Sequence, residues 1–184
     1  TVDWAAVENE FFSALNNLRQ DPQSFIGNLE DFKKLFKGDI LYRPGEIPLQ
    51  TVEGISAIDE CIEDLKKAKP LEPLTRVDEL DKAARAHCDD IGPKGLTSHD
   101  GTDGSNCSDR IERFCEWEET CAENLDFGSK NGYNCLISLL IDDGVQGRGH
   151  RKNLLSNKVK YVGIAGGNHK EYEGCLVVDF VGNY

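Results

Sequence analysis

The order of the predicted elements indicates an α+β fold. Apolar residues recur with a helical period of about 3.6 residues through most of the first half of the chain. Runs rich in valine and isoleucine, bounded by turn residues, cluster at residues 161–167 and 175–182. Helices first and strands last favour α+β over an alternating β-α-β arrangement. No glycine-rich dinucleotide fingerprint or phosphate-binding loop motif occurs, so nothing favours nucleotide binding.

The first 70 residues read as three helices. A helix is predicted from Trp4 until Asp21-Pro22 interrupts it, because the residue before a proline avoids helical angles. A second helix follows over residues 23–36, and prolines and glycines then make residues 39–50 a loop or edge strand. The third helix, residues 51–70, carries an apolar stripe of Val52, Ile55, Ile58, Ile62 and Leu65.

The remaining elements follow the same logic. A fourth helix is expected to start at a Thr75–Asp78 capping box and to stop at Gly92. A short helix is predicted around residues 109–114, a strand over 120–128, and a helix over 134–144 that Gly144 closes. The two valine-rich runs, joined by a turn, predict an antiparallel hairpin.

Length and charge limit the functional classes. The 184 residues are enough for one domain, so we expect a single domain over 1–184, with a helical part about 1–70 and a core about 71–184. A net charge of −12 argues against nonspecific binding of nucleic acid or anionic membranes, which require a basic face. No apolar run approaches the roughly 20 residues of a membrane span. Because the chain contains no methionine, Thr1 is expected to follow a removed signal, a propeptide or a cloning boundary.

Two of the four histidines stand out as site candidates. His99 in "TSHDG" and His150 in "GRGHRKN" lie in glycine-rich segments, where a ligand can approach, and imidazoles bind Zn²⁺ or Cu²⁺. By contrast, we expect His87 to be a core residue bonded to a carbonyl, and His169 to be solvated in the hairpin turn.

Two acidic residues complete the candidate set. Glu123 in "AENL" is placed to orient an imidazole or to act as a base. Asp142 and Asp143 end a predicted helix, where carboxylates oppose the helix dipole, so another role is indicated. The Asp100–Asn106 segment resembles a calcium loop but lacks its bidentate glutamate. No nucleophile lies in a known catalytic motif.

These motifs together resemble the CAP superfamily of cysteine-rich secretory proteins, antigen 5 and pathogenesis-related proteins. The segments "TSHDG", "AENL", "DDGVQGRGHRKNLL" and "CLVVDFVGN" occur in that family's order, and the resemblance covers Leu15 to the end. It implies a three-layer α-β-α sandwich with a central, largely antiparallel sheet. It also implies a cleft formed by His99, Glu123 and His150, with Asp142 as the nearest counterpart of the family's fourth, glutamate position.

The resemblance further implies a secreted binding protein acting in defence, host interaction or signalling. Its histidine pair, His99 and His150, would hold Zn²⁺ or another divalent cation, and a sterol or lipid ligand or a protein partner is implied as well. The alternatives are a metal-dependent hydrolase or protease with Glu123 as base, and a structural or interaction protein with a vestigial cleft. Nucleic-acid binding and a transmembrane role are not implied.

Cysteine usage adds an expectation about compartment. An odd count of seven leaves at least one cysteine free or intermolecular. Within an oxidising compartment we expect a disulfide among Cys107, Cys115 and Cys121, and an intracellular protein with reduced cysteines is the alternative. The other four lie singly in apolar contexts and are expected to pack as small hydrophobic residues: Cys61, Cys88, Cys135 and Cys175.

Overall fold

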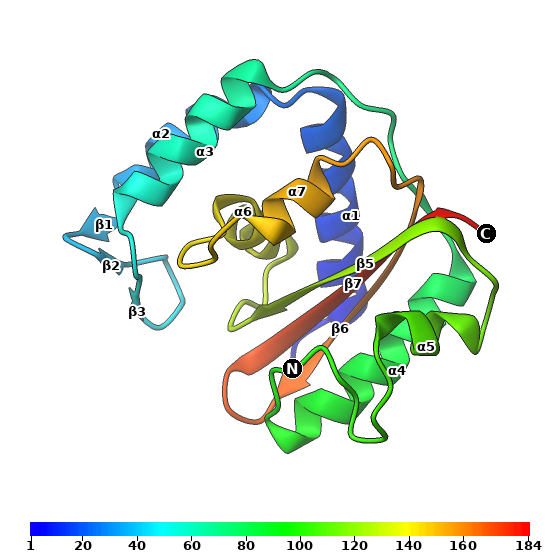
Figure 1. The fold of residues 1–184 in the computed structure, drawn as a ribbon. Helices are drawn as coiled ribbons and strands as arrows, with labels where there is room; N and C mark the ends of the chain where they lie inside the picture. The colour runs from blue at the N-terminus through cyan, green and yellow to red at the C-terminus, as the bar shows by residue number, and fades with distance from the viewer.

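The computed structural model describes all 184 residues and centres on one four-stranded sheet (Figure 1). Its strand order is β4-β6-β7-β5, with β4 spanning Thr75–Arg76, β5 Glu118–Phe127, β6 Tyr161–His169 and β7 Glu173–Asn183. The β5–β7 and β6–β7 pairs are antiparallel, and only the short β4–β6 pair is parallel. The predicted hairpin and the strand at 120–128 are therefore confirmed.

Helices cover both faces of this sheet. The helices α1 (Trp4–Gln20), α6 (Gly132–Ile141) and α7 (Gly149–Leu154) lie on one side, and α4 (Asp78–Lys94) and α5 (Cys107–Glu112) lie on the other (Figure 1). This arrangement is the three-layer α-β-α sandwich that was expected. None of the helices is long and apolar enough to cross a membrane.

The remaining elements form an extension at one side of the sandwich. Helices α2 (Ser24–Lys33) and α3 (Ile55–Lys67) run side by side, and a small antiparallel sheet lies at their end (Figure 1). That sheet contains β1 (Phe36–Lys37), β2 (Ile40–Leu41) and β3 (Leu49–Gln50). The main hydrophobic core of 26 buried residues connects this extension with α1, α6 and the sheet.

Three details of the sequence-based helix boundaries were wrong. Val52 precedes α3 and is 75% exposed, so it is not part of the apolar stripe. Thr75 lies in β4, and α4 begins at Asp78 without a side-chain cap. Gly92 does not end α4, which continues to Lys94 and ends at Gly95 in the left-handed conformation.

Tertiary packing explains the glycine at position 92. A β-carbon on Gly92 would lie 2.5 Å from the backbone oxygen of Asn168 at the end of β6. The glycine therefore permits close contact between α4 and the end of the hairpin. That requirement has the same sequence signature as a helix stop, which is why the boundary was misplaced.

Candidate functional site

The four predicted site residues come together beside the edge strand β5, and the region that they border is termed the cleft. His99 comes from the loop between α4 and α5, and Glu123 comes from β5 itself. Asp142 ends α6, and His150 lies in the first turn of α7. The ring centroids of His99 and His150 are 6.5 Å apart. Segments up to 51 positions apart in sequence thus contribute to one small volume.

Each histidine is held by one carboxylate. The Nδ1 atom of His99 lies 3.0 Å from Oε1 of Glu123, and Nδ1 of His150 lies 2.8 Å from Oδ1 of Asp142. A carboxylate at Nδ1 favours the tautomer that carries its proton there, which leaves Nε2 with a free lone pair. Both imidazoles are therefore prepared to offer Nε2 as a ligand or a proton acceptor.

Asp142 explains the apparent conflict with the helix dipole. Its backbone is the left-handed cap of α6, with a φ of 59°. Its carboxylate points away from α6 and accepts from the backbone N–H of His150 at 3.0 Å as well as from the imidazole. Asp142 thus places its charge at the start of α7, where the orientation of the peptide dipoles is favourable.

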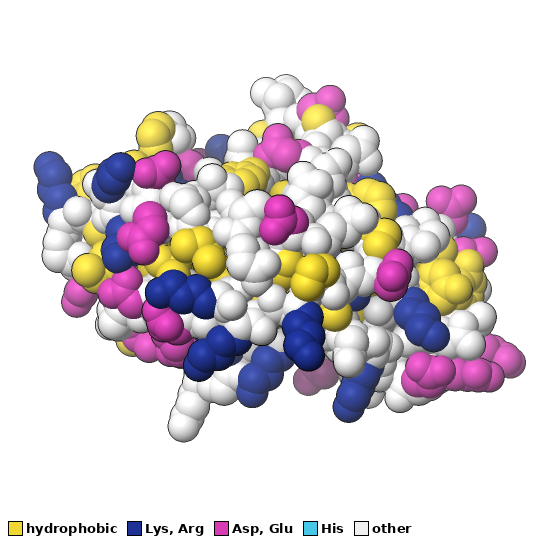
Figure 2. All heavy atoms as spheres, turned by 90° about the horizontal axis from the view of Figure 1, so that it is seen from above, with side chains coloured by type: hydrophobic (Ala, Val, Ile, Leu, Met, Phe, Trp, Pro, Cys, Tyr) yellow, Lys and Arg dark blue, Asp and Glu magenta, His cyan; other side chains and the backbone are white.

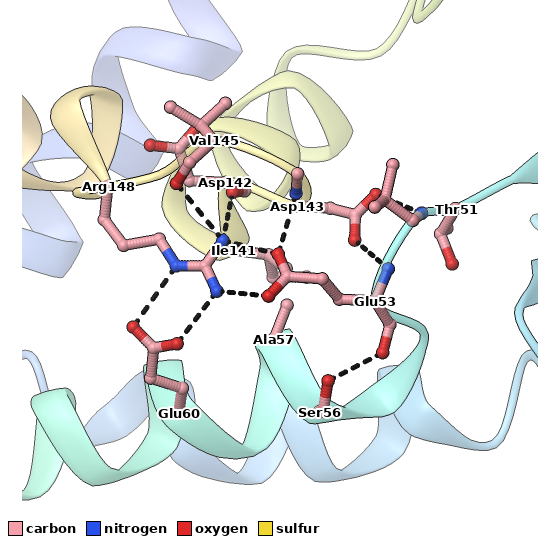
Figure 3. Close-up of polar contacts among 12 residues, drawn as sticks. Thr51, Glu53, Ser56, Ala57, Glu60, Ile141, Asp142, Asp143, Val145 and Arg148 are labelled. Carbon is pink, nitrogen blue, oxygen red and sulfur yellow. Dashed lines mark hydrogen bonds and ion pairs between the residues drawn. The ribbon is translucent and has the colours of Figure 1, made fainter.

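Ion pairs anchor the loop that connects Asp142 with His150 (Figure 3). The Arg148 guanidinium binds both carboxylate oxygens of Glu53 at 2.6 and 2.8 Å and an oxygen of Glu60 at 2.8 Å. It also donates to the backbone oxygen of Asp142 at 2.7 Å. Hydrogen bonds from Arg148, with the backbone N–H of Gly144, lower the pKa of Glu53 to about 2. Helix α3 thereby fixes the position of the His150 side of the cleft.

The neighbouring Asp143 makes a second attachment. Its two carboxylate oxygens accept from the backbone N–H groups of Val52 and Glu53, each at 2.8 Å (Figure 3). The consecutive aspartates therefore have separate roles, with Asp142 orienting His150 and Asp143 holding the loop before α3.

Behind Glu123 lies a buried polar cluster that the sequence analysis missed. Arg110 donates to both oxygens of Glu123, at 3.1 and 2.9 Å, and both side chains are 2% exposed. Cross-strand pairing places Asp179 of β7 opposite Glu123. The Cys107 thiol donates to Oδ1 of Asp179 at 3.6 Å.

The carboxyl groups of Glu123 and Asp179 face each other but differ in pKa and in protonation. Burial and the charge of Glu123 raise the pKa of Asp179 well above its usual range. Burial by itself would raise the pKa of Glu123, but hydrogen bonds from His99 and Asp179 and the charge of Arg110 lower it to about 2. Asp179 is therefore the protonated partner, and its proton gives the otherwise unpaired Oδ2 a hydrogen bond to donate to Glu123.

Ligand atoms of Cys107, Glu123 and Asp179 lie within 4.8 Å of one another, close enough to hold one cation. In this cluster the Arg110 guanidinium already balances the Glu123 charge, and Asp179 is neutral. The donor set facing the cleft is different, because the two imidazole Nε2 atoms are not taken by protein hydrogen bonds. The histidine pair is therefore the better fit to a divalent ion.

Of the predictions for the other two histidines, the one for His87 is confirmed and the one for His169 is wrong. His87 is fully buried, with Nε2 2.9 Å from the backbone oxygen of Ser98, as expected of a core histidine. His169 is not solvated: it is 3% exposed, and its Nε2 lies 2.8 Å from the backbone oxygen of Leu96. The hairpin turn folds back onto the end of α4, which buries a residue that looks exposed in sequence.

The cysteines form contacts that sequence spacing does not show. All seven are thiols in the structure, and Cys61, Cys88, Cys135 and Cys175 are buried as predicted. The thiols of Cys107 and Cys121 lie close enough beside the Glu123 cluster to shift each other's pKa, and the Cys88 thiol in α4 donates to the backbone oxygen of Cys175 in β7 at 4.0 Å. Cys115 has no such partner among the cysteines.

Comparison with known proteins identifies the fold family. The model of the cysteine-rich secretory protein family, CAP, matches residues 12–184, so the chain belongs to this family. No curated protein sequence is significantly similar to the chain.

Two solved structures support the fold. An outer surface protein of Borrelia burgdorferi shares 18% identity with a TM-score of 0.53, over 73% of this chain and 98% of that protein. An extracellular protein of Bacillus anthracis that contains an SCP domain shares 20% identity with a TM-score of 0.50, over 70% of this chain. The chain matches only 38% of the length of that second protein.

Proposed function

We propose that this chain is a secreted binding module whose cleft histidines hold a divalent cation. The observation that carries the proposal is the pair of carboxylate–histidine contacts that leave two Nε2 atoms at adjacent rings. Zinc–nitrogen bonds measure about 2.0–2.1 Å, so rings that share an ion must lie slightly closer than the observed centroid separation. His99, whose side chain is 53% exposed, has room for that movement.

In this arrangement each chain residue has a definite role. His99 and His150 would bind the ion through Nε2, while Glu123 and Asp142 fix the tautomer and the ring orientation. Arg110 keeps Glu123 ionised, and Arg148 holds the loop that carries His150. A bound divalent ion would supply a positive charge and open coordination positions for an anionic or oxygen-bearing ligand.

Zinc titration by calorimetry tests the proposal. We expect saturable binding to the purified chain, at least tenfold weaker binding after His150→Ala or His99→Ala, and unchanged binding after Lys130→Ala, a surface change on another segment. Equal heats for the wild type and both histidine variants would contradict the assignment. No heat for the wild type would instead favour a protein with a vestigial cleft.

A hydrolase that uses the same cleft is the alternative. The chain contains a buried carboxylate beside an imidazole, but Arg110 and Asp179 hold the pKa of Glu123 low, which makes it a weak base. A binding role is therefore favoured over catalysis. Cleavage of casein or peptides that disappears in His150→Ala would overturn this choice.

Secretion would place the thiol pairs in an oxidising compartment. We propose that Cys107 and Cys121, which already contact each other, form the disulfide there. Both thiols lose a proton, and their two electrons reduce a small disulfide such as oxidised glutathione to two thiols. Thiol counting under denaturing conditions, before and after such treatment, should show two fewer free thiols in the wild type and no such loss in Cys121→Ser.

A further inference from the structure

A second pocket lies beside the cleft, beneath the small sheet. It is a cavity of about 260 Å³ between β1–β3, the end of β5, and α6, and Asp142 and His150 line it on the cleft side. Nine apolar side chains form most of its walls: Phe32, Phe36, Leu41, Leu49, Leu125, Phe127, Leu139, Ile141 and Val145. This volume is slightly below the roughly 300–1,000 Å³ of sites for drug-sized ligands, so the pocket suits a smaller molecule.

Several polar groups in the wall are already occupied by the protein. Asp142 binds His150, and both oxygens of Asp143 accept backbone N–H groups. The Thr51 hydroxyl donates to the backbone oxygen of Asp39 at 2.5 Å. These groups shape the pocket, and they have little capacity left for a ligand.

Arg43 differs from them. Its side chain is 10% exposed, and its Nε lies 2.6 Å from Oε2 of Glu46. The two terminal nitrogens of its guanidinium, Nη1 and Nη2, donate to no acceptor in the protein, although Arg43 lines the cavity. A guanidinium presents these donors in a planar fork that matches a carboxylate. These nitrogens are not among the buried polar atoms that lack a partner, so they are accessible from the cavity and available to an anionic group of a ligand.

Asp126 supplies the opposite charge in the same cavity. It is 7% exposed on β5, and Ser138 and Cys135 of α6 lie beside its carboxyl group. No lysine, arginine or histidine lies within ion-pair distance of it. The cavity therefore combines apolar walls, a donor fork for a carboxylate and an acceptor for an ammonium group.

We propose that this cavity binds a small apolar α-amino acid as its zwitterion. The carboxylate pairs with Arg43, the ammonium group pairs with Asp126, and the apolar side chain packs between the small sheet and β5. The zwitterion is the ligand class that both unused charges recognise at once, and its zero net charge suits a chain that is strongly acidic overall. The cavity shares His150 and Asp142 with the proposed metal site, but His99, the other proposed metal ligand, does not line it.

Calorimetric titration with phenylalanine and two of its fragments tests the proposal. The fragments are 3-phenylpropanoate, which lacks the ammonium group, and phenethylamine, which lacks the carboxylate. We expect phenylalanine to bind at least tenfold more tightly than either fragment. A fragment that binds as tightly as phenylalanine would overturn the zwitterion assignment.

Two variants test whether Arg43 binds the carboxylate of the ligand and Asp126 binds its ammonium group. Arg43→Met should weaken phenylalanine and 3-phenylpropanoate at least tenfold and leave phenethylamine unchanged, and Asp126→Asn should weaken phenylalanine and phenethylamine only. Arg113→Met, which changes an exposed arginine paired with Asp103, is the matched control and should change nothing. Equal loss of all three probes in either variant, with the fold intact by circular dichroism, would contradict the proposed contacts.

Two further variants cover the case in which Arg43→Met does not fold and distinguish this cavity from the proposed metal site. If Arg43→Met does not fold, Leu49→Asp places a negative charge on a half-exposed wall residue and should weaken 3-phenylpropanoate more than phenethylamine; the opposite order would contradict the proposal. His99→Ala should lose zinc and keep phenylalanine, which separates failure of this site from failure of the metal site.

Discussion

The Glu123–Asp179 pair shows how single residues define the cleft. The two carboxyl groups face each other across adjacent strands in a buried environment, where both cannot be ionised at low cost. Arg110 and His99 stabilise the charge on Glu123, and Asp179 keeps a proton. One buried ion pair and one shared proton thereby give the cleft a fixed carboxylate behind His99.

This assignment predicts unequal effects of two conservative substitutions on the free energy of unfolding. Asp179→Asn should change the free energy of unfolding by less than about 1 kcal/mol, because an amide can donate to Glu123 as the carboxylic acid does. Glu123→Gln should cost about 3 kcal/mol, because it leaves Arg110 buried without its counter-charge. Urea unfolding at pH 7 measures both, and equal costs would show that Asp179 is ionised.

Asp126 predicts a dependence of stability on pH. Burial raises its pKa from 3.8 to about 6 in the folded chain. Below the lower value both the folded and unfolded states are protonated, so no penalty exists. As pH rises through this window, the unfolded state ionises first, and the folded state loses up to about 3 kcal/mol relative to it.

Asp126→Asn should remove that penalty. The stability difference in favour of the variant should grow between about pH 4 and pH 6 and then remain constant, as followed by urea unfolding at several pH values. A difference that is independent of pH would show that the carboxyl group has an ordinary pKa.

At the scale of elements, close contact between α4 and β6 sets the thickness of the sandwich. A β-carbon on Gly163 of β6 would lie 2.1 Å from the backbone carbonyl carbon of Leu80 in α4. Gly163 therefore lets a helix lie directly on the strand. The same helix positions His87 and the loop that presents His99.

Gly163→Ala should consequently destabilise the chain by about 3 kcal/mol or more, because backbone would have to move. Gly27→Ala inside α2 is the matched control, since nothing lies within 4 Å of the position that its β-carbon would take. There the alanine should stabilise by roughly 0.5–1 kcal/mol through its helix propensity. Thermal unfolding compares the two, and similar effects would argue against the close helix–strand contact.

At the scale of the whole molecule, charge is abundant but mixed in sign. The face shown in Figure 2 carries acidic and basic side chains side by side, with hydrophobic residues between them and no histidine. Several basic side chains lie in a row along the lower part of this face, although the net charge of the chain is −12. A net charge of this size does not favour nonspecific binding to polyanions.

Zinc should also stabilise the whole chain if it binds the folded cleft. At a free zinc concentration of about 100 times Kd, the expected gain is about 2.7 kcal/mol, visible as a higher Tm that EDTA reverses. His150→Ala should show no gain. A zinc-dependent shift that survives in this variant would place the ion elsewhere, for example at Cys107, Glu123 and Asp179.

Much of this architecture could be predicted from local patterns. Helical periodicity located α1 to α3, and the valine-rich runs located β6 and β7, because the side-chain period reflects which face of each element is buried. Four site residues were recognised by their motifs and their order along the chain. Their burial and mutual contacts are not local properties, and His169 shows how a residue in a turn can be buried by a distant helix.

The sequence by itself determined the fold class, the principal elements and the identity of His99, Glu123, Asp142 and His150 as candidates. Only the tertiary structure decided which groups meet. It placed Arg110 and Asp179 behind Glu123, brought Cys107 close to Cys121, and brought Arg43 and Asp126 to one cavity. A lone charge inside an apolar strand, such as Asp179, was the available signal, but charge and proton position depend on neighbours that only folding supplies.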